Sequence, residues 1–264
     1  RHIKLCELLI EYPKTDLNIK NFSDKTALTI AVDNNLDSVI DILIVNDKLD
    51  PEENNLNYAF YYSSPSICKH IIASKKIDVN TVFQYKQNKQ NGYNRNYYLK
   101  EVGTNDTKLV QATSANDLEL VDLIINHPSF DQDKSDLKRA IFTSISSNNI
   151  EMFRKLIKIT NNDINTYERN GQNIFSYALE MKSNEILLDI FKNPSFELKG
   201  RDILTDFIQS FTQNISVNFQ LKASIEIMKG LYNYDQNHDH LINLNSLLKN
   251  GKTFFTSIPM NLGN

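Results

Sequence analysis

Residues 24–31 read Asp24-Lys25-Thr26-Ala27-Leu28-Thr29-Ile30-Ala31. The hydroxyl group of Thr26 can cap the start of a helix, because it accepts a hydrogen bond from a backbone N–H group that has no partner in the first turn. Leu28 and Ala31 are three residues apart and share one face of that helix. The small side chain of Ala31 allows a neighbouring helix to approach closely. This stretch therefore predicts a short helix that packs through one face.

A second helix is predicted directly after the first. Asn34-Asn35 ends the first helix, because asparagine adopts left-handed backbone angles more readily than most residues. Val39, Leu43 and Ile44 then follow the i, i+4, i+5 spacing of an apolar stripe. One such pair of short helices cannot bury its apolar face alone, whereas stacked copies can.

The same internal spacing recurs along the chain, which is the signature of a repeat architecture. A small residue is followed by an apolar residue after 8 positions, by an apolar pair after 12 and 13, and by an acidic residue after 19 (39 − 31, 43 − 31, 44 − 31 and 50 − 31). The small residues are, in order, Ala31, Ala59, Ala112, Ser144 and Ala178.

This unit resembles the ankyrin repeat, whose signature is a T-P-L-H-x-A segment, a second helix ending in a leucine pair, and a D-v-N finger. The resemblance lies in residues 26–31, 171–178 and 251–258, with Asp78-Val79-Asn80 and Asp163-Ile164-Asn165 as finger ends. None of the segments carries the proline or the histidine of the family pattern, so the resemblance is to a divergent member. It implies an all-α, ankyrin-repeat solenoid of stacked helix-turn-helix units with hairpin-like fingers.

The predicted organisation is a single ankyrin-repeat array over residues 1–264. Ala59 and Ala112 are 53 residues apart (112 − 59), whereas other neighbouring units are 28 to 34 apart, which predicts an insertion loop at 83–105. Incomplete units at both ends predict that the chain is a fragment of a longer array. The units are a half unit 1–18, then about 19–50, 51–80, 106–131, 132–163, 164–197 and 198–242, and a partial unit 243–264.

Composition limits the environment and the partners. The net charge of −3 argues against bulk electrostatic binding to nucleic acid or to an anionic membrane. There is no apolar run of about 18 residues, so no membrane span is expected. Cys6 and Cys68 share a repeat position with Ile40, which is a core position, and two reduced, buried thiols are typical of an intracellular protein. We therefore expect a cytoplasmic protein, with the cytoskeleton as one setting.

The expected function is protein binding. The resemblance implies a scaffold or adaptor without catalysis, within a larger assembly, including a cytoskeletal one. One alternative is a regulatory or targeting segment of a longer chain that carries an enzyme domain elsewhere. A further alternative is binding of RNA or another anion through the insert, where basic and aromatic residues interleave.

The candidate binding residues come from three places. Ankyrin arrays bind through finger tips and the first-helix surface, and Tyr58 and Tyr62 form an aromatic cluster that is either an interface anchor or local packing. The insert residues are either a contact surface or a solvated finger extension. The candidates are Lys20, Asn21, Lys25, Tyr167, Arg169 and Gln172 on fingers, Tyr58 and Tyr62, and Tyr85, Tyr93, Arg95, Tyr97 and Tyr98 in the insert.

One acidic segment has the beginning of a calcium-binding loop. Residues 235–240 have the D-x-N-x-D spacing of an EF-hand, but His240 stands where the loop needs glycine and Ser246 where it needs glutamate. A zinc site from His238 and His240 would lack two further ligands nearby. The sequence therefore predicts no metal site and no cofactor.

Overall fold

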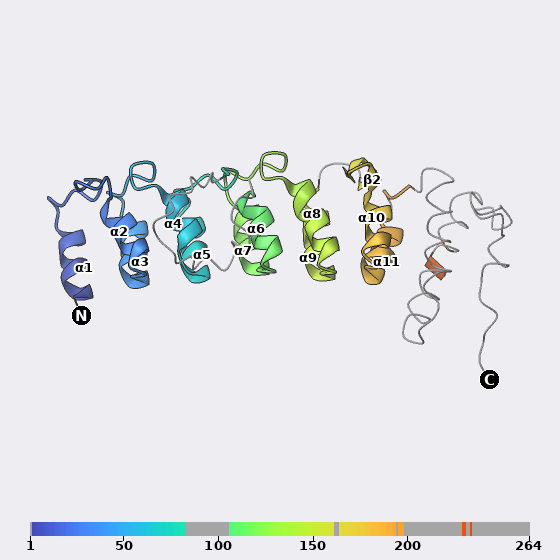
Figure 1. The fold of residues 1–264 in the computed structure, drawn as a ribbon, viewed down its shortest axis with the longest axis horizontal. Coiled ribbons are helices and arrows are strands. Elements are labelled where there is room, and N and C mark those ends of the chain that lie inside the picture. The colour runs from blue at the N-terminus through green and yellow to red at the C-terminus, as the bar shows by residue number, and fades with distance from the viewer. Residues whose placement is uncertain are drawn as a thin grey trace, which may run out of the picture. The chain divides into compact units, whose positions relative to one another are not determined.

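The chain is mostly helical, which confirms the broad fold class predicted from the sequence. The computed structural model describes residues 2–82, 106–160, 164–193, 195–197, 229–230 and 233. Within these ranges it contains eleven α-helices, one short 3-10 helix and one two-stranded sheet (Figure 1). None of the helices in these ranges is long and apolar enough to cross a membrane. The predicted insertion loop 83–105, nearly all of unit 198–242 and the partial unit 243–264 lie outside the described residues.

The chain divides into two compact units, residues 1–140 and 141–264, each of which is described by itself. In the first unit α1, α3, α5 and α7 pack one against the next, while α2, α4 and α6 each pack against the helix that follows (Figure 1). The helices are α1 (Ile3–Glu11), α2 (Ala27–Asp33), α3 (Asp37–Val45), α4 (Leu56–Tyr62), α5 (Pro65–Ala73), α6 (Lys108–Ser114) and α7 (Leu118–Ile125), and α8 (Leu137–Ser146) crosses into the second unit.

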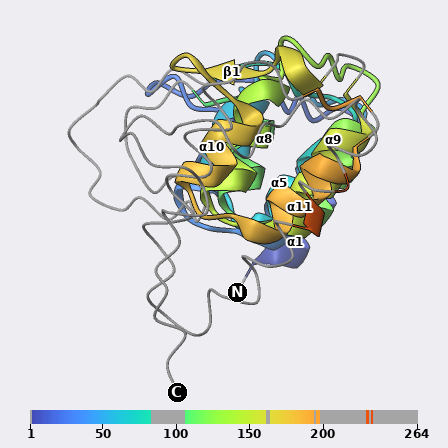
Figure 2. The ribbon, with the colours of Figure 1, turned by 90° about the vertical axis from the view of Figure 1, so that its right-hand side faces the viewer.

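The second unit adds a small β-hairpin to the helices, so the described chain is not purely α-helical. Strand β1 (Glu168–Arg169) pairs antiparallel with β2 (Gln172–Asn173) through a two-residue turn, Asn170-Gly171, in which both residues have positive φ. This is the turn that matches the twist of a hairpin. Helix α11 packs against both α10 and α9, and Figure 2 shows α9 and α11 on one side of this unit with α10 on the other. The remaining elements are α9 (Ile150–Lys158), η1 (Ile164–Thr166), α10 (Ile174–Glu180) and α11 (Asn184–Lys192).

The second helix of each pair starts at a fixed distance from the small residue of the first. The differences 37 − 31, 65 − 59, 118 − 112, 150 − 144 and 184 − 178 all equal 6. In four pairs the residue four positions after the small residue is left-handed, with φ between 50° and 58°: Asn35, Asn116, Asn148 and Lys182. The predicted role of Asn34-Asn35 is confirmed. In the remaining pair Ser64 caps α5 and Pro65 occupies its first turn instead.

Polar residues cap α2, α4, α6 and α10, and the sequence predicted this role for Thr26. Thr26 accepts a hydrogen bond from the backbone N–H of Thr29 at 3.3 Å, which confirms its predicted role. Thr107 and Asn173 occupy the same repeat position and cap α6 and α10. In α4 the cap is Asn55, which lies one residue later in the repeat than Thr26, Thr107 and Asn173. The backbone of Asn55 has left-handed angles.

Asparagine side chains join successive finger loops. The Nδ2 of Asn80 donates to the carbonyl oxygen of Ser129 at 2.5 Å, and its Oδ1 accepts from the N–H of Asp131 at 3.0 Å. The fully buried hydroxyl of Ser135 also donates to this Oδ1. We call this pair of bonds, to a carbonyl and to the N–H two residues later, an asparagine bridge. The same bridge links Asn18 to Lys48 and Asp50, and Asn165 to Ser195 and Glu197.

The two cysteines are free, as predicted, but only one lies in the core. Cys68 is fully buried and its thiol donates to the carbonyl oxygen of Phe60 at 2.9 Å, and burial raises the pKa of this thiol. Cys6 is only half-buried, because α1 has fewer neighbours than the helices that follow it. Ile40, which shares the repeat position of Cys6 and Cys68, is fully buried as expected.

Replacing Gly171 with alanine is expected to lower the free energy of unfolding of the second unit by roughly 1–2 kcal/mol. The φ of Gly171 is 77°, and a Cβ added there meets no atom within 4 Å, so the loss comes from the backbone and not from a clash. Gly171→Asn serves as the control, since asparagine tolerates left-handed angles and should lose less. Urea unfolding of both variants checks this, and equal losses would contradict it.

Candidate functional site

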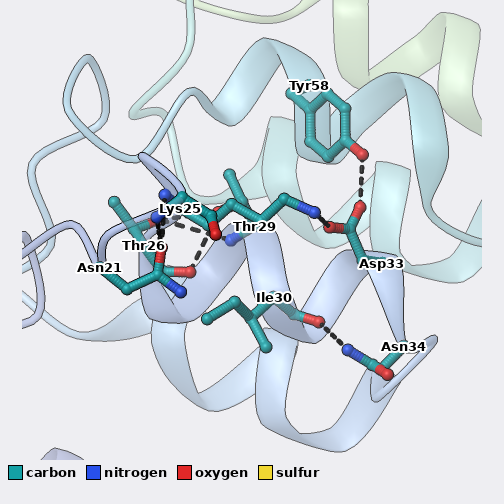
Figure 3. A network of polar contacts seen from close by, with 9 residues as sticks. Asn21, Lys25, Thr26, Thr29, Ile30, Asp33, Asn34 and Tyr58 are labelled. Atoms are coloured by element: carbon teal, nitrogen blue, oxygen red, sulfur yellow. Dashed lines mark hydrogen bonds and ion pairs between the residues drawn. The ribbon is translucent and has the colours of Figure 1, made fainter. Parts of the chain in front are cut away.

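The loop before α2 is braced by one of the predicted contact residues. The Oδ1 of Asn21 accepts from the N–H groups of Ser23 at 2.9 Å and Lys25 at 3.1 Å, and the backbone N–H of Asn21 donates to the carbonyl oxygen of Lys25 at 3.0 Å. Asp24 completes the turn with a φ of 59°. Asn21 therefore holds the shape of the loop 19–25, whereas the sequence suggested a direct contact (Figure 3).

Two of the predicted residues contact Asp33, which was not among the candidates predicted from the sequence, and a third packs against one of them. The Nζ of Lys25 is 2.6 Å from one carboxylate oxygen of Asp33, and the hydroxyl of Tyr58 donates to the other at 2.5 Å (Figure 3). The rings of Tyr58 and Tyr62 lie 4.5 Å apart between centroids. Asp33 thus joins the loop, α2 and α4 on the first-helix surface. Asp33 lies seven residues after Thr26, which is two helical turns, and this spacing is the feature of the sequence that could have placed it on the same helix face.

Lys20, also in the loop before α2, pairs with the next finger. Its Nζ is 2.8 Å from Oε2 of Glu53, and the hydrogen bond raises the pKa of the Lys20 ammonium. Both side chains are substantially exposed. Such a surface pair contributes little stability, so the charges remain accessible to a partner.

The most exposed apolar side chains of this loop, Ile19 and Phe22, were not predicted as contact residues. Ile19 is 66% exposed and Phe22 is fully exposed. Ile19 lies three residues after the finger aspartate Asp16. In the other described units the same position holds Glu53, Thr81, Lys134 and Thr166, and none of these residues is buried. Phe22 lies nine residues before the small residue Ala31, and this position holds the exposed Asp50 and Arg169 in two other units but the fully buried Ser135 in a third (59 − 50 = 178 − 169 = 144 − 135 = 9). Because both side chains are exposed, packing between units does not explain either apolar residue.

The predicted residues of the second finger mostly contact their own helix. Tyr167 is 6% exposed and its hydroxyl hydrogen-bonds with Thr160, so it serves packing and is not part of a surface. The guanidinium of Arg169 lies over the Tyr177 ring, 5.4 Å from its centroid. The Nε2 of Gln172 donates to Glu180 at 2.5 Å. This hairpin presents Arg169 to solvent but brings no apolar anchor beside it.

Lys108 is a fully buried lysine that was not among the candidate residues predicted from the sequence. Its Nζ lies 2.8 Å from Oδ1 of Asn57, 2.7 Å from Oγ1 of Thr81, 3.0 Å from the Thr81 carbonyl oxygen and 3.2 Å from that of Asp78. The rings of Phe60 and Tyr61 lie within 6 Å. Burial lowers the pKa of Lys108 to about 7, against a smaller opposing effect of the Asp78 charge. These hydrogen bonds join the repeat at about 51–80 to the repeat at about 106–131. They also leave the buried amine out of reach of a ligand.

The other candidate residues fall outside the described chain. These are Tyr85, Tyr93, Arg95, Tyr97 and Tyr98 of the insert, the acidic segment 235–240 and the segment 251–258. Among the residues that the structure places, no group of three or more histidine, cysteine, aspartate or glutamate side chains could hold a metal ion.

Comparison with known proteins finds no relative of this chain. No protein-family model, no curated protein and no solved structure matches it. The proposals below therefore depend on the residues and contacts of this chain alone.

Proposed function

We propose that this chain binds another protein through its first finger, without catalysing a reaction. The observation that carries the proposal is the exposure of Phe22 and Ile19 on a loop that Asn21 holds rigid. Aromatic residues are enriched among the few side chains that dominate binding energy. A loop that is already ordered loses little conformational freedom on binding, which favours affinity.

The neighbouring surface suits a rim around that anchor. Lys25, Asp33 and Tyr58 form a polar group that joins the loop, α2 and α4, and Lys20 with Glu53 adds a second exposed pair. Interfaces commonly combine a small apolar centre with a polar, solvent-accessible periphery. Because the pairs are of mixed charge, they favour a partner that offers both donors and acceptors around an apolar pocket.

We further propose that the described helix pairs are units of a divergent ankyrin-type solenoid. Three observations support this: the constant start of the second helix, the left-handed turn residues, and the asparagine bridges between fingers. In such an array each unit contacts only its neighbours, and the fingers project from the stack. That arrangement would make the first finger a natural place for a partner to bind.

Replacing Phe22 with alanine is expected to leave thermal stability unchanged and to weaken partner binding by about 30-fold or more, the loss of about 2 kcal/mol seen at binding hot spots. The ring is fully exposed, so its removal opens no cavity. The measurement uses a photo-reactive phenylalanine analogue at position 22, irradiated in native lysate. The matched control carries the analogue at Lys134, whose side chain is 72% exposed on another finger.

A discrete adduct at position 22 that is absent at position 134 is expected. Excess unlabelled wild-type chain should suppress this adduct, and excess Phe22→Ala chain should not. The same adducts from both positions, or equal competition by the two chains, would show that the first finger is not the anchor.

A further inference from the structure

Helix α1 has an apolar stripe that no described residue covers. Leu5, Leu8, Leu9 and Tyr12 are 54%, 63%, 55% and 54% exposed. Leu5, Leu8 and Leu9 are spaced i, i+3 and i+4 and therefore share one face of the helix, and Tyr12 follows as the residue at its C-terminal end. The opposite side of α1 packs against α3 and buries Ile10.

The equivalent helix shows how such a stripe is normally covered. Helix α3 begins 34 residues after α1 (37 − 3), so Leu5 corresponds to Val39 and Leu9 to Leu43. Val39 is 7% exposed and Leu43 is fully buried. The difference comes from neighbours, because α3 packs against α2 as well as against α1 and α5. Thus Leu5 and Leu9 occupy positions that, one unit later, lie in an interface between helices, whereas the residues equivalent to Leu8 and Tyr12 are half-buried.

The apolar residues of α1 therefore differ in kind from Ile19 and Phe22. Val39 and Leu43 show that the positions of Leu5 and Leu9 are packing positions, whereas the position of Ile19 is not buried in the other described units and the Phe22 side chain is itself fully exposed. A partner on the α1 stripe would continue the packing of the fold.

We propose that this stripe is a docking surface for an amphipathic helix of the α2 type, paired with α1 as α2 is paired with α3. Helix α2 places Leu28, Ala31 and Val32 in its buried face, and the small Ala31 allows close approach. The occupant should likewise present two larger apolar residues around a small one. This inference depends on the equivalence of the helix pairs and not on the role of Phe22.

The size of the stripe favours such a helix over a second copy of the chain. A stable interface between separate proteins involves about 20–30 residues on each side. The stripe offers three exposed leucines within the nine residues of α1, with Tyr12 directly after the helix. A helix joined to α1 by a short turn needs less area, because the connection raises its effective concentration.

The test grafts a copy of residues 24–36 in front of Ile3, in place of residues 1 and 2. Helix α3 begins 34 residues after α1, so the last copied residue, number 36, takes position 2 (36 − 34). The copy therefore precedes α1 at the same spacing at which α2 precedes α3. The control graft carries glutamate in place of the copied Leu28 and Ala31. Amide hydrogen exchange in α1 is expected to slow by about tenfold or more with the first graft and to stay unchanged with the control.

Leu9→Glu supplies a second readout. In the ungrafted chain it should leave the unfolding midpoint nearly unchanged, because Leu9 is exposed, and in the grafted chain it should lower the midpoint and restore fast exchange. Equal exchange with both grafts would overturn the proposal. So would sedimentation showing that the unmodified chain is a dimer that Leu8→Glu dissociates, because a second copy would then occupy the stripe. None of these outcomes depends on cross-linking at position 22.

Discussion

Replacing Lys108 with methionine is expected to abolish a rise in stability that the wild-type chain shows between pH 7 and pH 9. The Lys108 amine has a pKa of about 7 when folded, below the ordinary 10.5 of an exposed lysine. Between these values the unfolded chain binds more protons than the folded chain, so the free energy of unfolding rises with pH. Over this interval the expected gain is about 2 kcal/mol, and it is lost again as the pH falls through 7.

The physical cause is the desolvation of the ammonium group. Lys108 is fully buried beside Phe60 and Tyr61, and its oxygen partners are uncharged groups of Asn57, Thr81 and Asp78. Neutral acceptors offset only part of the cost of removing a charge from water. The neutral amine is therefore the form that the folded chain favours above pH 7.

Urea unfolding at pH 7, 8 and 9 measures the effect. Lys138→Met is the control, because Lys138 is exposed on α8 and should leave the pH dependence as it is. The informative quantity is the difference in the free energy of unfolding between each variant and the wild type at each pH, since other groups titrate in the same range. A Lys108→Met chain with the wild-type slope would contradict the burial of this amine.

Replacing Asn80 with alanine is expected to lower the free energy of unfolding by roughly 2–4 kcal/mol. The change removes the bonds to Ser129 and Asp131 and leaves the fully buried Ser135 hydroxyl without this acceptor. Buried polar groups that lose their partner retain the full cost of desolvation.

Asn126→Ala is the matched control for the bridge. The Asn126 side chain is exposed and bonds only locally, to the carbonyl oxygen of Asp122 within the same turn, at 2.8 Å. Its removal should change stability by no more than about 0.5 kcal/mol. If the two asparagine variants unfold at the same urea concentration, the bridge at Asn80 contributes nothing specific.

Local patterns in the sequence predicted the helices well. Thr26 as a cap, Asn35 as a left-handed turn residue and the buried pair Leu43-Ile44 all depend on neighbours within one or two helical turns. Such short-range preferences are visible in a single sequence. The strands β1 and β2 were expected only as hairpin-like fingers, although Asn170-Gly171 is a strong hairpin signal.

Contacts between distant residues were not predictable in the same way. The bridge from Asn80 spans 49 residues to Ser129, and the sequence assigned its asparagines to turns in general. Lys108 follows a capping threonine and gave no sign that a lysine would be buried. Phe22 stands in a polar turn, where one aromatic residue among asparagine, serine and aspartate was the signal to notice.

The amide NMR spectrum of a chain that lacks residues 1–50 tests most directly whether helix pairs depend only on their neighbours. In the proposed solenoid, α7 lies two helix pairs beyond α3, so removing α1, α2 and α3 leaves its surroundings intact. We predict that the amide signals of residues 118–125 keep their wild-type chemical shifts and dispersion. Collapse of these signals to unfolded positions would show that the chain has one shared core and would contradict the stacked arrangement.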